Sequence, residues 1–183
     1  MTRQHKIGAL LLAGAVAGLA VFTQADASGP RGVPVRIGTP KDGRLEKSDA
    51  EWRAVLGDQA YRVARRKGTE RAYSGESWDE TRAGEYACAC CGQVVFASAA
   101  KYDSGTGWPS FFGPADIEAV STFQEGGPLD DRTEVACSRC DAHLGHVFDD
   151  GPRPTGLRYC MNSAALRFAP APPAPDTAGA LPH

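Results

Sequence analysis

The stretch CSRCDAHLGHVFDDGPRPTGLRYCMNSAALRF, from Cys137 to Phe168, carries most of the reactive side chains of this 183-residue chain. It opens with the cysteine pair Cys137 and Cys140, continues with two histidines, and reaches the isolated Cys160 after a turn-rich segment. Cysteine and histidine side chains at such spacings bind metals, transfer protons and attack electrophiles. We therefore interpret this stretch as half of a metal site that leads directly into a reactive thiol.

A second cysteine pair, Cys88 and Cys91, has the same C-x-x-C spacing as Cys137 and Cys140. Two such knuckles supply the thiolates of a tetrahedral zinc site that has no open coordination position. We therefore predict one structural zinc ion per chain, bound by these cysteines. The alternatives are disulfides, which are the default in exported proteins, and a redox-active C-x-x-C pair. Cys90 is interpreted as a bystander beside the first knuckle.

The surroundings of Cys160 favour a functional thiol over the more common buried one. Arg158 precedes it by two residues and Asn162 follows it by two, so on a strand the three side chains share one face. A nearby guanidinium favours the thiolate, which is the nucleophilic form. His143 and His146 could supply protons if their turn faces that strand. We therefore predict a set made of a nucleophile, proton donors and an orienting group.

The remaining pattern predicts a mainly β fold of small, twisted, antiparallel sheets with a barrel-like arrangement. Short apolar runs between turns give six candidate strands: Glu85–Cys88, Gln93–Phe96, Ile117–Phe123, Arg132–Ala136, His146–Phe148 and Leu157–Met161. Two short helices should precede them. Ser48 and Glu51 form a capping box for the first helix, and the second should cover Gln59 to Lys67 and end at Gly68.

The N-terminal segment has the pattern of a signal peptide, which we assign to residues 1–27. Arg3 and Lys6 precede the apolar run Ile7–Thr23, and Ala25 and Ala27 form a small-x-small cleavage site. We expect cleavage after Ala27 and a periplasmic or secreted protein. The alternative is an uncleaved leader, in which case the chain would be held at a membrane.

Three further segments complete the expected organisation. Residues 28–46 are rich in Gly and Pro and predict a flexible linker. Residues 47–168 form the expected catalytic domain, and residues 169–183 a disordered Pro- and Ala-rich tail. The formal net charge of −2 provides no basic field that would attract nucleic acid, so none is expected as a partner.

Several long blocks surround the cysteine pairs in a recognisable order. They are KGTE (67–70), SGE (74–76), YDSGTGWPSF (102–111), DAHLGHVF (141–148) and RYCMNSAAL (158–166). In these blocks the chain resembles the type B peptide-methionine (R)-S-oxide reductases, and the resemblance covers roughly Trp52 to Phe168. It implies an enzyme that reduces methionine-R-sulfoxide in proteins or peptides to methionine, and so repairs oxidised exported proteins.

The resemblance also implies roles for individual residues. Trp108 receives the methyl group of the substrate, and Cys160 attacks as a thiolate and becomes a sulfenic acid. His143, His146 and Asn162 protonate the sulfoxide oxygen, and Arg158 helps to hold the thiolate.

One position departs from the resemblance. Many relatives carry a resolving cysteine where this chain has Thr106, and threonine cannot form a disulfide. The sulfenic acid could then be reduced by a thioredoxin-like donor, by a small thiol or by Cys90. We expect an external donor, because zinc binding would hold Cys90 on its knuckle.

Two other classes of protein share some of these features. A zinc-stapled binding module could use the same knuckles, but it would not need a thiol between Arg158 and Asn162. An exported thiol-disulfide oxidoreductase would use one C-x-x-C pair as its redox centre. A zinc ion that is retained after substitution of Cys160 would favour the reductase.

Overall fold

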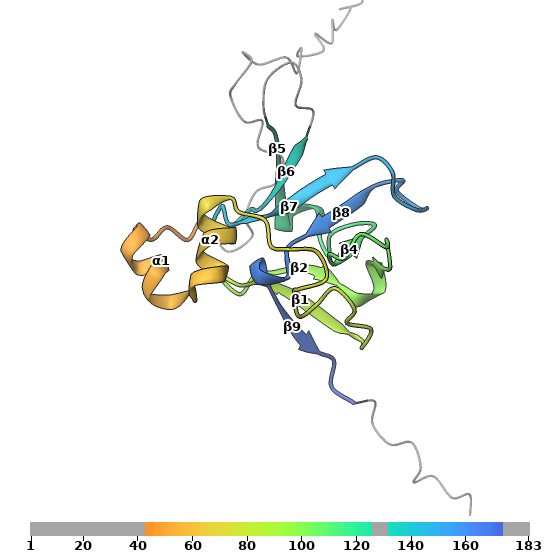
Figure 1. Ribbon diagram of the computed structural model, residues 1–183, viewed down its shortest axis with the longest axis horizontal. Helices are drawn as coiled ribbons and strands as arrows, with labels where there is room; N and C mark the ends of the chain where they lie inside the picture. The colour runs from red at the N-terminus through yellow and green to blue at the C-terminus, as the bar shows by residue number, and fades with distance from the viewer. Residues whose placement is uncertain (1–42, 126–131, 174–183) are drawn as a thin grey trace, which may run out of the picture. The chain divides into compact units, whose positions relative to one another are not determined.

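The computed structural model describes residues 43–125 and 132–173, which form two helices followed by two antiparallel sheets (Figure 1). The mainly β fold class with short N-terminal helices is therefore confirmed. The predicted leader, residues 28–42 of the predicted linker and the last ten residues of the predicted tail (174–183) lie outside the described residues.

The two helices follow the capping signals of the sequence. Helix α1, Asp49–Val55, begins at Ser48, whose side chain accepts a hydrogen bond from the Glu51 amide at 3.3 Å, and the reciprocal bond of a capping box is present. Helix α2 spans Asp58–Arg66. Among the described residues, no helix combines the length and the apolar character that crossing a membrane requires.

Helix α2 ends at Arg66, one residue before the expected Lys67. The residue in the left-handed conformation is Lys67, at φ 52°, and not Gly68. Gly68 is needed for another reason, because a Cβ atom there would lie 2.9 Å from the carbonyl oxygen of Arg62. Lys67 is therefore the residue that follows the end of α2.

The smaller sheet has three strands in the order β2-β1-β9. Strand β1 spans Gly84–Cys88, β2 spans Val94–Ala97 and β9 spans Leu166–Pro170. Both neighbours run antiparallel to β1. Strand β9 was not expected from the sequence.

The larger sheet has six strands in the order β3-β4-β8-β7-β6-β5. In that order they span Lys101–Tyr102, Ser110–Phe111, Arg158–Met161, His143–Phe148, Thr133–Cys137 and Val120–Gln124. Each neighbouring pair is antiparallel. The expected strand Ile117–Phe123 begins instead with a 3-10 turn, η2 (Ile117–Ala119), which the Asp116 side chain caps. Two further 3-10 turns are η1 (Ser98–Ala100) and η3 (Ser163–Ala165).

Aromatic side chains from both sheets form the centre of the core. Phe96 of β2 stacks on Phe111 of β4 with ring centroids 4.5 Å apart, and Tyr86 of β1 meets Phe111 edge-on at 5.0 Å. All three are fully buried. Burial of such large apolar surfaces holds the two sheets together.

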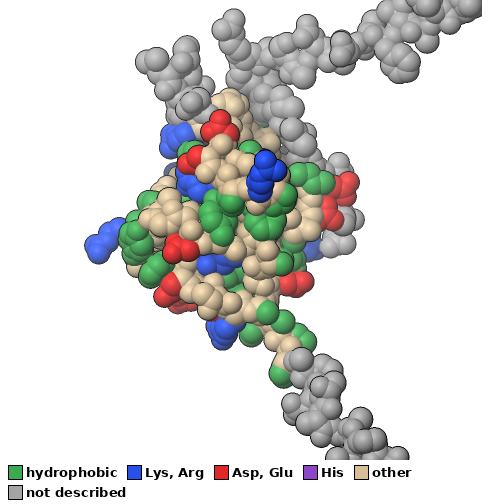
Figure 2. All heavy atoms as spheres, turned by 90° about the vertical axis from the view of Figure 1, so that its right-hand side faces the viewer, with side chains coloured by type: hydrophobic (Ala, Val, Ile, Leu, Met, Phe, Trp, Pro, Cys, Tyr) green, Lys and Arg blue, Asp and Glu red, His purple; other side chains and the backbone are tan. Residues whose placement is uncertain are grey.

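The displayed face of the molecule is mixed in character. On the face that Figure 2 displays, Lys and Arg side chains lie apart from one another among acidic and hydrophobic ones.

Candidate active site and metal centre

Cys160 lies in the middle of the larger sheet, in a row of side chains that crosses several strands. It is directly opposite Ser110 of β4 and His146 of β7, and His146 is opposite Glu134 of β6. Residues that are directly opposite in an antiparallel sheet project from the same face. The pairing therefore places a hydroxyl, a thiol, an imidazole and a carboxylate side by side.

A bulge in β7 brings the second histidine close to the first. Val135 pairs with Gly145, whereas Ala136 pairs with His143, so β7 has one residue more than β6 at this point. An extra residue disturbs the normal alternation of side chains. The rings of His143 and His146 consequently lie together, with centroids 5.3 Å apart, although the two residues are three apart in sequence.

Each histidine is hydrogen-bonded to a carboxylate. His143 Nδ1 lies 2.8 Å from Glu134 Oε1, and His146 Nε2 lies 2.9 Å from Glu125 Oε2. Lys67 Nζ donates to both carboxylates, at 2.5 Å to Glu134 and 3.4 Å to Glu125. Burial alone would raise the pKa of Glu134, but the hydrogen bonds and charges of His143 and Lys67 hold it below its usual value. The carboxylate is therefore ionised.

The sequence did not identify these three additional residues. Glu134 gave one signal, because it is a carboxylate inside the predicted strand Arg132–Ala136. Side chains alternate along a strand, so Glu134 should project from one face of the sheet only. Lys67 was noted only as part of the KGTE block and Glu125 not at all, because both meet the histidines only after the sheet and α2 have packed together.

The Cys160 thiol is half-buried, and burial raises its pKa. Three groups oppose this effect. They are the Thr106 hydroxyl, whose oxygen lies 4.0 Å from Sγ, the charge of Arg158, and Ser110. Arg158 is held in place by two bonds to Asp150, at 2.7 and 2.8 Å. The hydroxyls and the anchored cation thus offset part of the rise in pKa that burial causes.

Asn162 follows directly after the end of β8, where the backbone is still extended. It is 3% exposed, and its side chain accepts from the Glu70 amide and donates to the Leu144 carbonyl, both at 3.1 Å. It therefore connects the loop after α2 with the bulge of β7.

Trp108 is half-buried, and its Nε1 donates to the Glu70 carbonyl at 3.2 Å. The preceding Gly107 has φ +85°, and a Cβ atom there would lie 2.7 Å from the ring of Tyr73. Tyr73 is itself 57% exposed. The glycine thus allows an exposed aromatic ring to pack against the backbone next to Trp108.

Two cavities differ in their relation to these residues. One of about 420 Å³ is lined by residues that flank Cys160, among them Thr106 and Arg158. A larger one, of about 790 Å³, lies along Glu70–Ser77 and the start of α2 and contains none of the predicted site residues. Of the two, only the smaller cavity is lined by groups that act on the thiol, Thr106 and Arg158.

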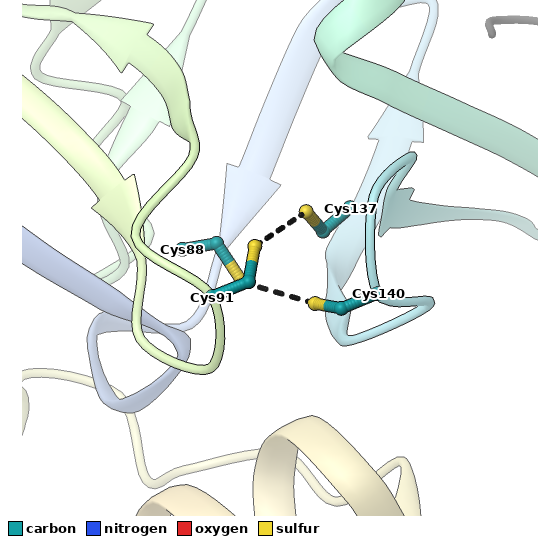
Figure 3. Close-up of side chains that lie close together, drawn as sticks. All are labelled: Cys88, Cys91, Cys137 and Cys140. Carbon is teal, nitrogen blue, oxygen red and sulfur yellow. Dashed lines mark hydrogen bonds between the residues drawn. The ribbon is translucent and has the colours of Figure 1, made fainter. Parts of the chain in front are cut away.

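The two cysteine pairs meet as predicted from their spacing (Figure 3). The sulfur atoms of Cys88, Cys91, Cys137 and Cys140 all lie within 4.8 Å of one another. Cys88 Sγ is 3.7 Å from Cys140 Sγ, and Cys91 Sγ is 3.5 Å from Cys137 Sγ. A tetrahedral zinc with bonds of about 2.3 Å requires sulfur atoms roughly 3.8 Å apart. The cluster therefore fits a metal ion, and every cysteine of the chain is a free thiol.

A thiol that is flanked by hydroxyls, a guanidinium and paired imidazoles is typical of enzymes with a cysteine nucleophile. Residues 56–170 match the SelR domain family, so the chain belongs to that family.

Three relatives make the family membership more specific. The peptide methionine sulfoxide reductase MsrB of Hahella chejuensis is 58% identical over 125 residues, which are 68% of this chain and 90% of the relative. Its counterpart in Thiobacillus denitrificans is 56% identical over 124 residues, 68% and 94% of the two chains. The MsrB of Acinetobacter baylyi is 50% identical over 126 residues, 69% and 91% of the two chains. The predicted resemblance to methionine sulfoxide reductases of type B is thus confirmed.

Proposed function

We propose that this protein reduces methionine-R-sulfoxide in proteins or peptides to methionine, with Cys160 as the nucleophile. The observation that carries the proposal is the position of Cys160 directly between Ser110 and His146. The membership of the chain in the SelR family supports the reaction. Burial raises the pKa of the Cys160 thiol, and the Thr106 hydroxyl and the charge of Arg158 oppose this rise, which supports their proposed role in stabilising the thiolate.

The reaction transfers one oxygen atom. The Cys160 thiolate attacks the sulfoxide sulfur, and a proton reaches the sulfoxide oxygen as the sulfur–oxygen bond breaks. The methionine sulfur gains two electrons, the Cys160 sulfur loses two, and the oxygen with its proton ends on Cys160 as a sulfenic acid. His143 and His146 supply the proton, and Asn162 holds the bulge that carries them.

Trp108 is the proposed wall for the methyl group of the substrate. Its ring is half-buried, and its only polar atom already bonds to the Glu70 carbonyl. The remaining aromatic surface suits an apolar methyl group. Arg158 lines the adjoining cavity and keeps the thiolate in place.

The proposed cofactor is one structural zinc ion bound by Cys88, Cys91, Cys137 and Cys140. Bound there, it would have no open coordination position, so it would contribute a cross-link and no reaction chemistry. The sulfur–sulfur distances of 3.5 and 3.7 Å support this ion.

Recycling of the sulfenic acid requires an external thiol donor, which we propose is thioredoxin-like. Two donor thiols reduce Cys160 back to a thiol and leave as a disulfide, with the oxygen released as water. The Thr106 hydroxyl lies 4.0 Å from Cys160 Sγ and has no sulfur to offer. Cys90 belongs to the same knuckle as Cys88 and Cys91 and is the alternative internal donor.

The proposed location is the periplasm or the exterior, where the protein would repair oxidised exported proteins. The leader pattern of residues 1–27 supports export. Contact with a membrane is proposed only for a chain that keeps its leader, and nucleic acid is not proposed as a partner.

The decisive test uses Cys160→Ser. Wild-type protein should reduce the R epimer of a methionine sulfoxide peptide with dithiothreitol as the reductant and leave the S epimer intact. The variant should show no turnover above background, while Cys90→Ser should retain the activity. Turnover by Cys160→Ser would disprove the assignment of the nucleophile, and reduction of the S epimer alone would disprove the proposed substrate.

A further inference from the structure

Glu134 is a buried charged residue to which the proposed reaction has so far given no role. Its side chain is 4% exposed, and it lies between Lys67 Nζ at 2.5 Å and His143 Nδ1 at 2.8 Å. A carboxylate at such depth destabilises a fold unless its oxygens are bonded. Both oxygens of Glu134 are bonded, each to a different partner.

The donors and acceptors in this cluster determine that His143 Nδ1 carries a hydrogen. Lys67 has an ammonium group that can only donate, and an ionised carboxylate can only accept. Since Lys67 occupies Oε2, the other oxygen of Glu134 must accept a hydrogen from His143 Nδ1. In the neutral ring, Nε2 then carries a lone pair. This buried atom has no hydrogen-bond partner among the described residues.

The second histidine is bonded to its carboxylate through the other ring nitrogen. His146 bonds to Glu125 through Nε2, so in its neutral form Nδ1 carries the lone pair. Lys67 reaches Glu125 as well, at 3.4 Å. One lysine at the end of α2 thus links two carboxylates, and these carboxylates orient two rings that lie 5.3 Å apart.

We propose that Glu134, held by Lys67, is a positioning residue that fixes the Nδ1–H tautomer of His143 for proton transfer at Nε2. This inference rests on the proposed function. The Nε2 lone pair accepts the proton of the Cys160 thiol, and the resulting imidazolium delivers the same proton to the sulfoxide oxygen. The proton ends on the sulfenic acid, and His143 returns to its starting tautomer. Carboxylates that orient imidazoles in this way are a general feature of catalytic and metal sites.

The variant Glu134→Gln should reverse the tautomer. An amide has a single acceptor oxygen, and the cationic Lys67 should retain it. The amide NH2 then faces His143 Nδ1, which must accept, so the ring hydrogen moves to Nε2. A ring that already has a hydrogen on Nε2 cannot take the proton of Cys160 there. We expect kcat to fall about 100-fold, within the usual range for acid–base catalysis, with little change in KM.

The double variant Lys67→Met with Glu134→Gln should restore the tautomer. Without the lysine, the amide is free to turn its oxygen toward His143 Nδ1, which donates again. Met and Lys are equally strained at φ 52°, so the backbone at the end of α2 is matched. We expect the double variant to regain at least tenfold in kcat over Glu134→Gln. Glu85→Gln, an exposed position on β1, is the control for the loss of a carboxylate.

The tautomer is measured directly from the 15N shifts of the imidazole in full-length protein, and kcat and KM are measured in parallel. The expected series is Nδ1–H in the wild type, Nε2–H in Glu134→Gln and Nδ1–H in the double variant, with kcat following it. A tautomer that is unchanged in Glu134→Gln would overturn the proposal, as would a double variant no faster than the single one. The shifts report on Glu134 even if the wild type reduces no sulfoxide, so failure of the proposed function is seen separately.

Discussion

The groups around Cys160 shift the pKa of its thiol in opposite directions. Burial raises its pKa, while Thr106, Arg158 and Ser110 lower it. Arg158 is the only one of these groups with a full charge, and its position is fixed by Asp150 and by the ring of Phe148, whose centroid lies 4.3 Å from the guanidinium carbon. Removal of this one side chain should therefore have a measurable effect on the thiol.

Arg158→Met should raise the pKa of Cys160 further above its usual value, because the desolvation remains and the cation is lost. An opposite charge near a thiol shifts its pKa by about one unit, which is a tenfold change in thiolate at a pH below the pKa. Alkylation of Cys160 by iodoacetamide at pH 8 should therefore slow about tenfold. The rate is read by mass spectrometry of the Cys160 peptide in a Cys90→Ser background.

Arg167→Met on β9 is the matched control, because Arg167 is exposed and lies on the other sheet. Its alkylation rate should equal that of the parent. If Arg158→Met and the parent react equally fast over the whole pH range, the guanidinium has no influence on the thiol.

At the scale of single elements, the close pairing of β7 with β8 depends on a glycine. A Cβ atom at Gly145 would lie 2.1 Å from the carbonyl oxygen of Cys160 and 2.9 Å from Cα of Met161. These are backbone atoms of the paired strand β8, which cannot turn aside as a flexible side chain can. β7 and β8 therefore approach closely only because residue 145 has no side chain.

Gly145→Ala should separate the strands that carry His146 and Cys160. Overpacking of this kind costs about 2 kcal/mol, so the midpoint of urea unfolding should decrease, and sulfoxide reduction should fall at least tenfold. Gly113→Ala is the control, since its Cβ would meet no atom within 4 Å. Equal stability and activity of the two variants would show that the close approach at Gly145 is unimportant.

Elements with a local signal could be predicted from the sequence. The Ser48–Glu51 capping box defines the start of α1, and most of the apolar runs became strands within a few residues of the expected bounds. The strands that were missed lack such a signal. β3 and β4 have two residues each, and β9 ends in a Pro-rich segment. Pro170 is tolerated there because β9 is an edge strand, where a missing N–H need not face a neighbour.

The site could be predicted only where its members are close in sequence. Cys160, Arg158 and the paired histidines lie in one segment, so the sequence predicted them as one candidate set. The contact between Glu134 and His143 depends on the register between β6 and β7 and on an extra residue in β7. Lys67 joins them because α2 ends in a left-handed residue. Neither the bulge nor the unusual cap is encoded in a short pattern.

At the scale of the whole described region, the aromatic core and the cysteine cluster both join the two sheets. In the core, Phe96 of the smaller sheet stacks on Phe111 of the larger sheet. In the cluster, one cysteine pair begins at the end of β1 in the smaller sheet and the other pair begins at the end of β6 in the larger sheet. The hairpin after β6 also contacts the N-terminal segment, because Arg65 donates to the Cys140 carbonyl at 2.7 Å and the Leu45 amide donates to the Arg139 carbonyl at 2.7 Å. A metal ion in the cluster would therefore stabilise the sheets and the helices together.

Cys137→Ala should remove the proposed zinc and destabilise the whole fold. Structural zinc sites contribute folding free energy directly, and three remaining thiolates form a much weaker cage. We expect the metal content to fall from one zinc per chain to near zero and the melting temperature to fall by roughly 10 °C or more, given that about 1 kcal/mol corresponds to a few degrees in a domain of this size.

Cys90→Ala is the matched control, since Cys90 lies on the same knuckle outside the four-sulfur cluster and should keep both the metal and the melting temperature. Cys160→Ser should also keep the metal, because Cys160 lies outside the four-sulfur cluster. A Cys137→Ala protein that melts with the parent would show that the aromatic core alone holds the sheets together, and loss of zinc from Cys90→Ala would show that the ligand set is wrong.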